Sequence, residues 1–276
     1  MDILLVRYAE MGLKSRPVRQ RFQEILKENI MEALARVGEE ALISSDQGRI
    51  YVRPTVVQSA VGPVSRVFGV ASVSPALETS GSMEDIVTTA AHFSREVLER
   101  GQTFAIRARR EGSHPFTSMD VAREAGAEVL SHNMDRGVSV DLTSPDVEIF
   151  IEVRENRAFV FDRYVQGPGG LPMGSQGRVV AVVSRERDLL AAWLMMKRGC
   201  RVAVFSTEGL WKPLERWAPG LRVEKDGTLE ELIEDFNALG VVFGHTLEDM
   251  EKIVIDRYQV PSYHPLIGLS NGEIER

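Results

Sequence analysis

The sequence has one cysteine and no long apolar run, and both absences narrow the kind of protein it can be. With Cys200 alone, the 276-residue chain can form neither an intramolecular disulfide nor a cysteine-rich metal site. No stretch approaches the ~18 consecutive apolar residues of a bilayer-spanning helix. The start MDILLVRY also lacks the basic segment and cleavage site of a secretory signal. We therefore expect a cytoplasmic protein without a membrane partner.

The composition also lacks the low hydrophobicity and high charge of disordered chains. Hydrophobic residues make up 43% of the chain and charged residues 26%, and the 23 glycines and 12 prolines are ordinary numbers. Such a chain can bury enough apolar surface to fold without staples. Its length suits two domains of ~100 to 200 residues each.

The net charge of −7 is concentrated near the C-terminus. Residues 221–276 contain five Lys+Arg and twelve Asp+Glu, whereas the first 220 residues carry 28 charges of each sign. The arginines of this neutral part occur in clusters, which matter more for phosphate binding than the charge of the whole chain. The overall acidity therefore does not exclude a nucleic-acid partner.

The spacing of apolar residues predicts an α/β protein with a boundary near residue 170. Strands such as DILLVRY and TFAIRAR alternate with helices through residues 1–166, which we divide into 1–60 and 61–166. Five glycines and two prolines make 167–177 a linker. In residues 178–276 the apolar strands RVVAVVS, CRVAVFS and GVVFG are separated by helices, which is typical of a doubly wound parallel sheet. Helices are expected from Arg16 to a stop at Gly38 and at 55–67, 83–99, 117–134, 208–217 and 228–238.

The densest basic segment lies where a strand should end and a helix begin. Arginine forks match phosphate oxygens, an aromatic ring can stack on an unpaired base, and a helix N-terminus adds hydroxyl and amide donors. The alternative is a solvated loop with surface arginines and a core phenylalanine, and composition alone favours that alternative. The candidate residues are Arg107, Arg109, Arg110, His114, Phe116 and Ser118.

A second basic run lies at the start of the N-terminal helix. Lys14, Arg16 and Arg19 have the wrong sign for the positive end of the helix dipole. An anionic ligand would explain cations there, and the alternative is a charged helix face.

Several segments together resemble the tRNA 4-thiouridine sulfurtransferases. YAEMGLKSRPVRQRF is similar to their N-terminal ferredoxin-like region, and FAIRARREGSHPFTSMDVAREAGAEV, VDLTSPDVEIFIEV and RAFVFDRYVQGPGGLPMGSQGRV are similar to their THUMP domain and linker. LLAAWLMMKRGCRV and TLEDMEKIVIDRYQVPSYHPLIGL extend the resemblance over nearly the whole chain. It implies that the first two parts bind a tRNA acceptor stem and 3′ end, with no role for DNA. It also implies that the last part is a PP-loop (HUP-like) ATP pyrophosphatase domain.

The chain departs from that family where ATP would bind. The family reads Ser-Gly-Gly-x-Asp-Ser, and its glycines bring backbone N–H groups to the phosphates. Both glycines and the second serine are missing here, and a glutamate adds negative charge. We therefore expect no ATP cofactor. The two arginines could bind another anion or form a surface ion-pair cluster. The matching residues are Ser184, Arg185, Glu186, Arg187 and Asp188.

Two further departures concern the remaining chemistry. Gly244 runs directly into His245 without the family's glycine-rich segment, and the sequence ends at Arg276 before the family's sulfur-carrying cysteine. Cys200 begins a strand, where a buried structural thiol is favoured over a persulfide relay. We therefore assign no catalytic residue, and the five scattered histidines suggest no metal site.

These features lead to a tRNA-binding protein without adenylation activity. The alternative is a sulfurtransferase component for 4-thiouridine formation that depends on a partner for ATP and sulfur transfer. A third hypothesis, compatible with the first, is that the acidic C-terminal part recruits a tRNA-modification enzyme. The resemblance adds a homodimer sharing one acceptor stem as a candidate assembly.

Overall fold

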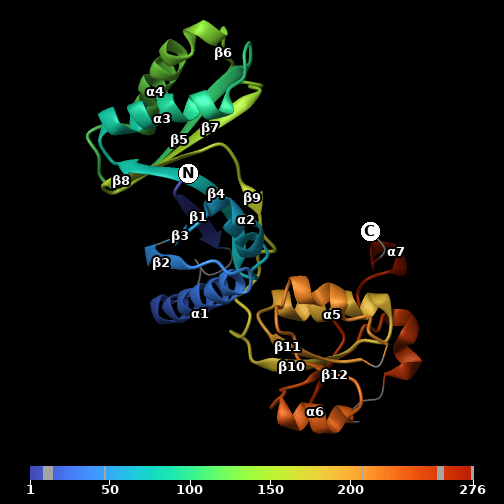
Figure 1. Cartoon of the computed structure of the whole chain (residues 1–276). Helices are drawn as coiled ribbons and strands as arrows, with labels where there is room; N and C mark the ends of the chain where they lie inside the picture. The colour runs from blue at the N-terminus through green and yellow to red at the C-terminus, as the bar shows by residue number, and fades with distance from the viewer. Residues whose placement is uncertain (9–14, 47, 207, 254–257, 275–276) are drawn as a thin grey trace. The chain divides into compact units, whose positions relative to one another are not determined.

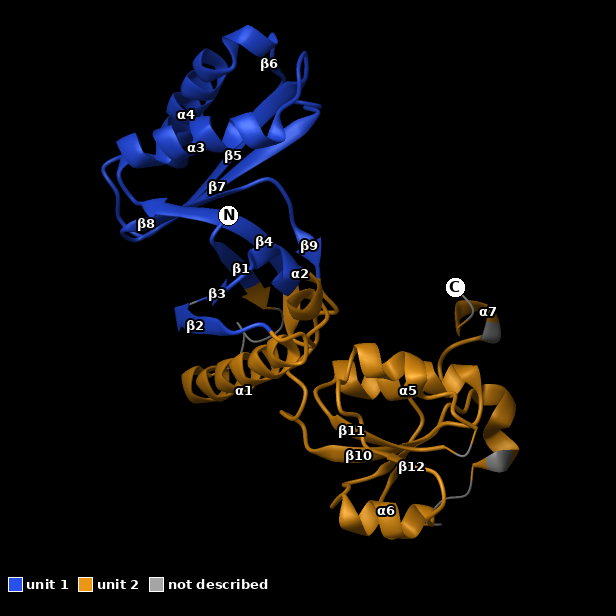
Figure 2. Cartoon of the chain, viewed as in Figure 1, with its two compact units in different colours: residues 1–6, 39–61, 72–166 blue, residues 7–38, 62–71, 167–276 orange. Residues whose placement is uncertain are grey.

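The computed structural model describes residues 1–8, 15–46, 48–206, 208–253 and 258–274 (Figure 1). They divide into two compact units, coloured separately in Figure 2. No helix in the described part is long and apolar enough to cross a membrane. Unit 1 comprises residues 1–6, 39–61 and 72–166, and unit 2 comprises residues 7–38, 62–71 and 167–276.

Unit 1 contains a mixed sheet with the strand order β2-β3-β1-β4-β8-β7-β5-β6, and β9 pairs with β4. β5 runs parallel to β6 and β7, whereas the β2–β3, β1–β3, β4–β8 and β7–β8 pairs are antiparallel. The strands are β1 (Ile3–Tyr8), β2 (Ala41–Asp46), β3 (Arg49–Pro54), β4 (Val70–Ser80), β5 (Thr103–Glu111), β6 (Ser139–Val140), β7 (Val147–Arg154), β8 (Arg157–Phe161) and β9 (Val165–Gln166).

Two helices cover one face of the β5–β7–β8 part of this sheet, α3 (Met83–Val97) and α4 (Ser118–His132) (Figure 1). Alternate strand residues point to opposite faces, so Phe104, Ile106 and Ile149 join the helices in one core. α3 begins as expected at Ser82, whose side chain accepts a hydrogen bond from the Asp85 backbone N–H. A second core, formed by residues of β1, β3, β4 and β8, is Ile3, Leu5, Tyr51, Ala76, Phe159 and Phe161.

Unit 2 contains a parallel sheet with the strand order β12-β11-β10-β13-β14. The chain starts in the middle at β10, moves outward to β12, then returns to the other side of β10, which confirms the doubly wound expectation. Helices α5 and α6 lie on opposite faces of the sheet (Figure 1). The elements are β10 (Arg178–Val182), α5 (Glu186–Lys197), β11 (Arg201–Phe205), β12 (Val223–Glu224), α6 (Leu229–Asp235), β13 (Val241–Val242), β14 (Ser262–Tyr263) and α7 (Asn271–Ile274).

The remaining helices agree with expectation in part. α1 (Arg16–Ala35) and α2 (Val57–Ser65) form where the apolar spacing predicts them. The helix expected at 208–217 is instead a short 3-10 helix, η2 (Lys212–Arg216). Gly209 has a φ of +73°, outside the helical range, and Pro213 has no N–H to donate, so a long α-helix cannot run through both.

Cys200 is buried directly before β11, as the structural interpretation predicts. Burial raises the pKa of its thiol, which disfavours the thiolate that sulfur transfer would need.

Candidate nucleic-acid interface and nucleotide site

Strand alternation separates the arginines that the sequence groups together on β5. Ile106 and Ala108 face the α3–α4 side, so Arg110 emerges on that side, whereas Arg107 and Arg109 lie on the opposite face. The three arginines therefore do not form one cluster on a single face of the sheet. They project from both faces near the end of β5.

Arg109 and Arg110 are the arginines of this group without a carboxylate partner. Both side chains are exposed, and neither forms an ion pair with any residue that the structure describes; Arg110 donates to the Gly112 carbonyl at 3.1 Å. Arg107, by contrast, pairs with Glu148 at 2.6 Å between Nε and Oε1. An incoming phosphate would displace no protein anion from Arg109 or Arg110, but it would compete with Glu148 for Arg107.

His114 and Phe116 lie together in the loop after β5. Their rings stack with centroids 5.4 Å apart and planes 26° apart. The Phe116 ring is half-buried and packs against the core beneath α3 and α4. Phe116 therefore makes the core contact expected of a structural residue and also has an exposed part that could stack on a base.

Thr117, not Ser118, caps the following helix. The Thr117 hydroxyl accepts from the Asp120 N–H at 3.2 Å, and the Asp120 carboxylate accepts from the Thr117 N–H at 2.9 Å. The hydrogen bonds that the Thr117 N–H and hydroxyl donate to the carboxylate lower the pKa of Asp120. Ser118 is the first helical residue and lines an open groove along the β5 edge with Arg107, Arg109, Met119 and Phe150.

The second basic run lies in unit 2, whereas the six candidate residues on and after β5 lie in unit 1. Arg16 is the exposed first residue of α1, and Arg19 is half-buried one turn later. Neither forms an ion pair with a described residue. Lys14 lies outside the described residues.

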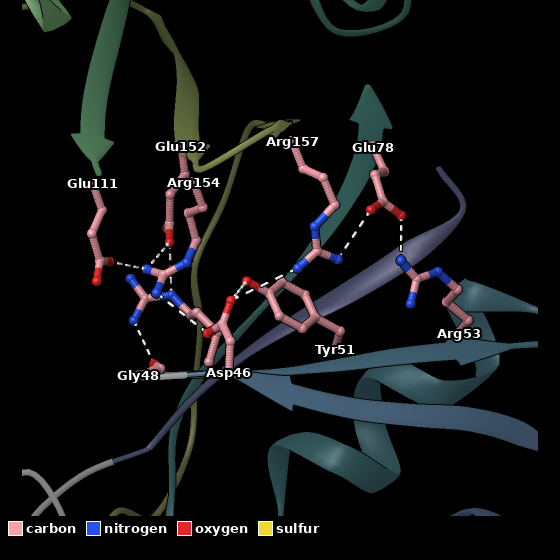
Figure 3. Close-up of polar contacts among 10 residues, drawn as sticks. Asp46, Gly48, Tyr51, Arg53, Glu78, Glu111, Glu152, Arg154 and Arg157 are labelled. Atoms are coloured by element: carbon pink, nitrogen blue, oxygen red, sulfur yellow. Dashed lines mark hydrogen bonds and ion pairs between the residues drawn. The ribbon is translucent and has the colours of Figure 1, made fainter. Parts of the chain in front are cut away.

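A buried charge network that the sequence reasoning missed lies between the β2–β3 hairpin and strands β7 and β8 (Figure 3). The Arg154 side chain, 7% exposed, contacts Asp46 and Glu152 at 3.3 Å each and also pairs with Glu111. Arg49 donates to the same Glu152 at 2.8 Å. Strand patterns in which a charge replaces an expected apolar residue, as in VEIFIEVR, are the sequence signal for such a network.

The network continues on the neighbouring strands. Arg157 contacts Asp46 at 3.7 Å and Glu78 at 3.3 Å, and Arg53 contacts Glu78 at 2.5 Å. The Tyr51 hydroxyl donates to Asp46 at 2.5 Å. These arginines neutralise internal carboxylates, so they are poor candidates for binding phosphate.

In unit 2 the carboxyl ends of β10 and β13 meet where the chain reverses direction across the sheet. Such a switch point is the usual ligand position in doubly wound proteins. Here it holds the segment 184–188 after β10 and the segment 244–246 after β13.

The carboxylate of Asp188 lies at this switch point. Its side chain is buried and its Oδ2 accepts the backbone N–H groups of Ser184 at 3.0 Å and Arg185 at 2.9 Å. Gly244 packs so closely that an added Cβ would lie 2.2 Å from Asp188 Oδ1. The backbone N–H groups of Ser184 and Arg185 are therefore bound within this loop, and Gly244 packs directly against the Asp188 carboxylate.

Arg185 and Arg187 both pair with Asp249, and Arg185 also lies 3.7 Å from Asp188. This arrangement matches the ion-pair alternative, although both carboxylates are buried instead of at the surface. Glu186 is exposed.

Next to this cluster the fold brings His245 and His264 together. Their rings stack at 5.1 Å and 16°, and His245 stacks on Phe243 at 5.2 Å. Burial lowers the pKa of both histidines. The sequence does not show this pair, because only the parallel β13–β14 pairing places residues 245 and 264 side by side. No group of three or more His, Cys, Asp or Glu side chains among the described residues could hold a metal ion.

Two family models match the chain. The THUMP domain model matches residues 80–162, and the ThiI ferredoxin-like domain model matches residues 3–74. The strands and helices of unit 1 thus belong to a THUMP-domain protein with a ferredoxin-like N-terminal region.

Curated relatives extend this likeness to the whole chain. The probable tRNA sulfurtransferase of Methanosarcina acetivorans is 34% identical over 327 residues, which cover 99% of this chain and 79% of the relative. That alignment is longer than this chain of 276 residues, so the relative has segments that are missing here. The probable tRNA sulfurtransferase of Methanobrevibacter smithii is 42% identical over 207 residues, which cover 73% of this chain and 52% of the relative. The chain belongs to the tRNA sulfurtransferase family.

Two crystal structures share the fold. PH1313 from Pyrococcus horikoshii superposes with a TM-score of 0.85 at 33% identity and covers 100% of this chain and 97% of that one. A 4-thiouridine synthetase in complex with RNA and ATP superposes with a TM-score of 0.77 at 22% identity, over 99% of this chain and 83% of that one. These likenesses confirm the ferredoxin-like, THUMP and doubly wound parts of the fold.

Proposed function

We propose that this protein binds the acceptor stem and 3′ end of tRNA through its ferredoxin-like and THUMP parts. The observation that carries the proposal is the pair of exposed arginines, Arg109 and Arg110, which have no carboxylate partner among the described residues and are followed in the chain by the stacked His114 and Phe116 rings. Unpaired guanidinium groups suit phosphates, and an aromatic pair suits an unpaired base. Family membership supports tRNA as the RNA, which the protein would meet in the cytoplasm.

A gel shift with an acceptor-stem minihelix tests this proposal. The RNA is used with and without its single-stranded 3′ overhang, against the full chain. We expect the overhang to tighten binding, because only unpaired bases offer a face for stacking. Equal affinity for both RNAs, or no binding of either, would contradict the proposal.

We further propose that the chain does not adenylate tRNA. What supports this is the loss of the two motif glycines: Arg185 and Glu186 put side chains where the family brings backbone N–H groups to the phosphates. Glu186 would also add a negative charge beside a phosphate bound in the family's manner.

The second candidate function is a tRNA sulfurtransferase component whose partner supplies ATP and sulfur transfer. Membership in the sulfurtransferase family favours it. Isothermal titration with ATP and Mg²⁺ tests whether the chain itself handles ATP, which both candidates exclude. Saturable micromolar binding that changes with Asp188→Ala would contradict both candidates and indicate a chain that uses ATP itself.

A further inference from the structure

A pocket of about 520 Å³ opens between the end of α5 and the residues after β14 in unit 2. Lys197 and Arg198 come from the helix end, and Tyr263 and His264 come from the strand end. The remaining lining residues are Gly170, Leu194, Met195 and Pro265.

The pocket carries positive charge without a compensating carboxylate. None of its lining residues is acidic, and neither Lys197 nor Arg198 forms an ion pair with a described residue. This is unusual for its surroundings, since residues 221–276 have twelve acidic and five basic side chains. Lys197 Nζ lies 5.2 Å from the centroid of the Trp193 ring, which positions the ammonium group without neutralising it.

The helix dipole explains only two of the four polar residues that line the pocket. Cations in the last turn of a helix offset the negative end of its dipole, which accounts for Lys197 and Arg198. It does not account for Tyr263 and His264, which reach the same pocket from a different element. Together they add a phenol and an imidazole, both able to donate hydrogen bonds to an anion.

The ring of His264 also gives the pocket a flat wall. It stacks on His245, which stacks on Phe243, so its orientation is fixed by two neighbouring rings. Leu194, Met195 and Pro265 supply apolar surface. A ligand that combines a phosphate with a planar ring would match both halves of the pocket.

We propose that this pocket binds the phosphate group of a nucleotide, with Lys197 and Arg198 contacting the phosphate oxygens and His264 and Tyr263 lying against the base. The nucleotide is either free in solution or part of a single-stranded RNA segment. The proposal does not depend on RNA binding by unit 1, because every residue of the pocket belongs to unit 2.

The test titrates the full chain with AMP, with adenosine, and with a short 5′-phosphorylated single-stranded RNA. The variant is the double replacement Lys197→Gln and Arg198→Gln. The matched control is Arg222→Gln, an exposed arginine of the same unit that pairs with Asp235 at 3.2 Å. Circular dichroism shows whether each variant is folded. Amide chemical shifts at residues 197–199 and 263–264 report where the probe binds.

We expect AMP to bind more tightly than adenosine, and the double variant to weaken AMP by at least about tenfold, since each charge-assisted contact to a phosphate is worth about that factor. Arg222→Gln should stay within about twofold. Whether the RNA, and not AMP, is the ligand is tested in a protein that also carries Arg109→Ala and Arg110→Ala. If the double variant weakens RNA binding in that background and AMP does not bind, the natural ligand is a single-stranded RNA segment.

Three results would overturn the proposal. The first is that neither AMP nor the RNA binds at this pocket. The second is that the double variant binds AMP as tightly as the wild type. The third is that binding depends on Arg185 and Arg187 instead of Lys197 and Arg198. A failure of the unit 1 variants to affect minihelix binding would contradict the proposed function alone and leave this pocket unaffected.

Discussion

At the residue scale, the arginines of unit 1 differ in whether they already form an ion pair with a carboxylate, which decides how well they can bind phosphate. Arg109 and Arg110 are exposed and without such a partner among the described residues, whereas Arg123 is equally accessible but pairs with Asp120 and Glu124. A contact with phosphate releases condensed counterions only if the cation was not already neutralised.

We therefore expect Arg109→Ala and Arg110→Ala each to weaken binding to all RNAs and to lower the slope of log affinity against log salt by roughly 0.7 to 0.9. Arg123→Ala serves as the matched control and should leave the slope unchanged. Fluorescence anisotropy at several salt concentrations measures it. An unchanged slope for Arg110→Ala would remove that residue from the interface.

Phe116 belongs to a different class of contact, because stacking carries no net charge. Phe116→Ala should cost about 1 to 3 kcal/mol for a minihelix with a 3′ overhang and should leave the salt slope nearly unchanged. A blunt duplex exposes no base face and should bind almost as before. Since the ring also packs against the core, the melting temperature is measured in parallel. Equal losses for both RNAs would make Phe116 a purely structural residue.

The sequence identified the residue types of this surface but not their directions. The run Arg107, Arg109, Arg110 reads as one cluster, and only the pairing of β5 with β7 shows that two faces are involved. Likewise, Glu148 is 41 residues from Arg107 in the chain, so the ion pair that occupies Arg107 could not be found from local spacing.

At the scale of elements, the start of α4 depends on a carboxylate. Hydrogen bonds from the Thr117 N–H and hydroxyl lower the pKa of Asp120 in the folded state. A depressed folded pKa means that the stabilisation is fully present above the unfolded value near 3.9 and is lost as the pH falls through the folded value. Asp120→Asn should therefore be less stable than the wild type at pH 7.

The difference between wild type and Asp120→Asn should shrink below about pH 4 and vanish once the wild-type carboxyl is protonated. Urea unfolding of both proteins at several pH values measures it. A stability difference that is the same at pH 3 and pH 7 would show that the carboxylate charge has no part in the cap.

The charge network of Figure 3 connects the β2–β3 hairpin to β7 and β8. Arg154 is 7% exposed and contacts the carboxylates of Asp46, Glu111 and Glu152, so its removal takes an arginine partner from Glu152, which is also 7% exposed. Arg154→Met should cost about 3 to 5 kcal/mol of unfolding free energy. Arg123→Met, on an exposed ion pair, should cost at most about 1 kcal/mol. Urea unfolding measures both, and similar small losses would make the network dispensable.

Element prediction from sequence succeeded where periodicity is long and capped, as in α3 and its Ser82 cap. It failed for β2, whose sequence ALISSD has too few apolar residues to signal a strand and forms because β3 pairs with it. Long-range pairing, which no local window contains, decided that strand.

At the scale of the whole molecule, both units contain paired and unpaired cations. Arg109 and Arg110 of unit 1 form no ion pair with a described residue, whereas Arg185 and Arg187 at the switch point of unit 2 pair with Asp249. The parallel sheet of unit 2 is fully formed despite the altered loop, because its core uses apolar residues of β10, β11, α5 and α6. The absence of the two glycines therefore leaves the parallel-sheet fold intact.

We therefore expect the full chain to release no AMP from ATP above a buffer control, with or without tRNA. The physical reason is local: Arg185 and Glu186 stand where the family has two glycines, and the N–H groups of Ser184 and Arg185 are already bound to Asp188. Asp188→Ala frees both N–H groups but should not restore activity, because Arg185 and Glu186 still carry side chains at the two positions where the family has glycine. Thin-layer chromatography of labelled ATP detects the product. AMP formation that Asp188→Ala abolishes would show that this carboxylate acts on the nucleotide instead of excluding it.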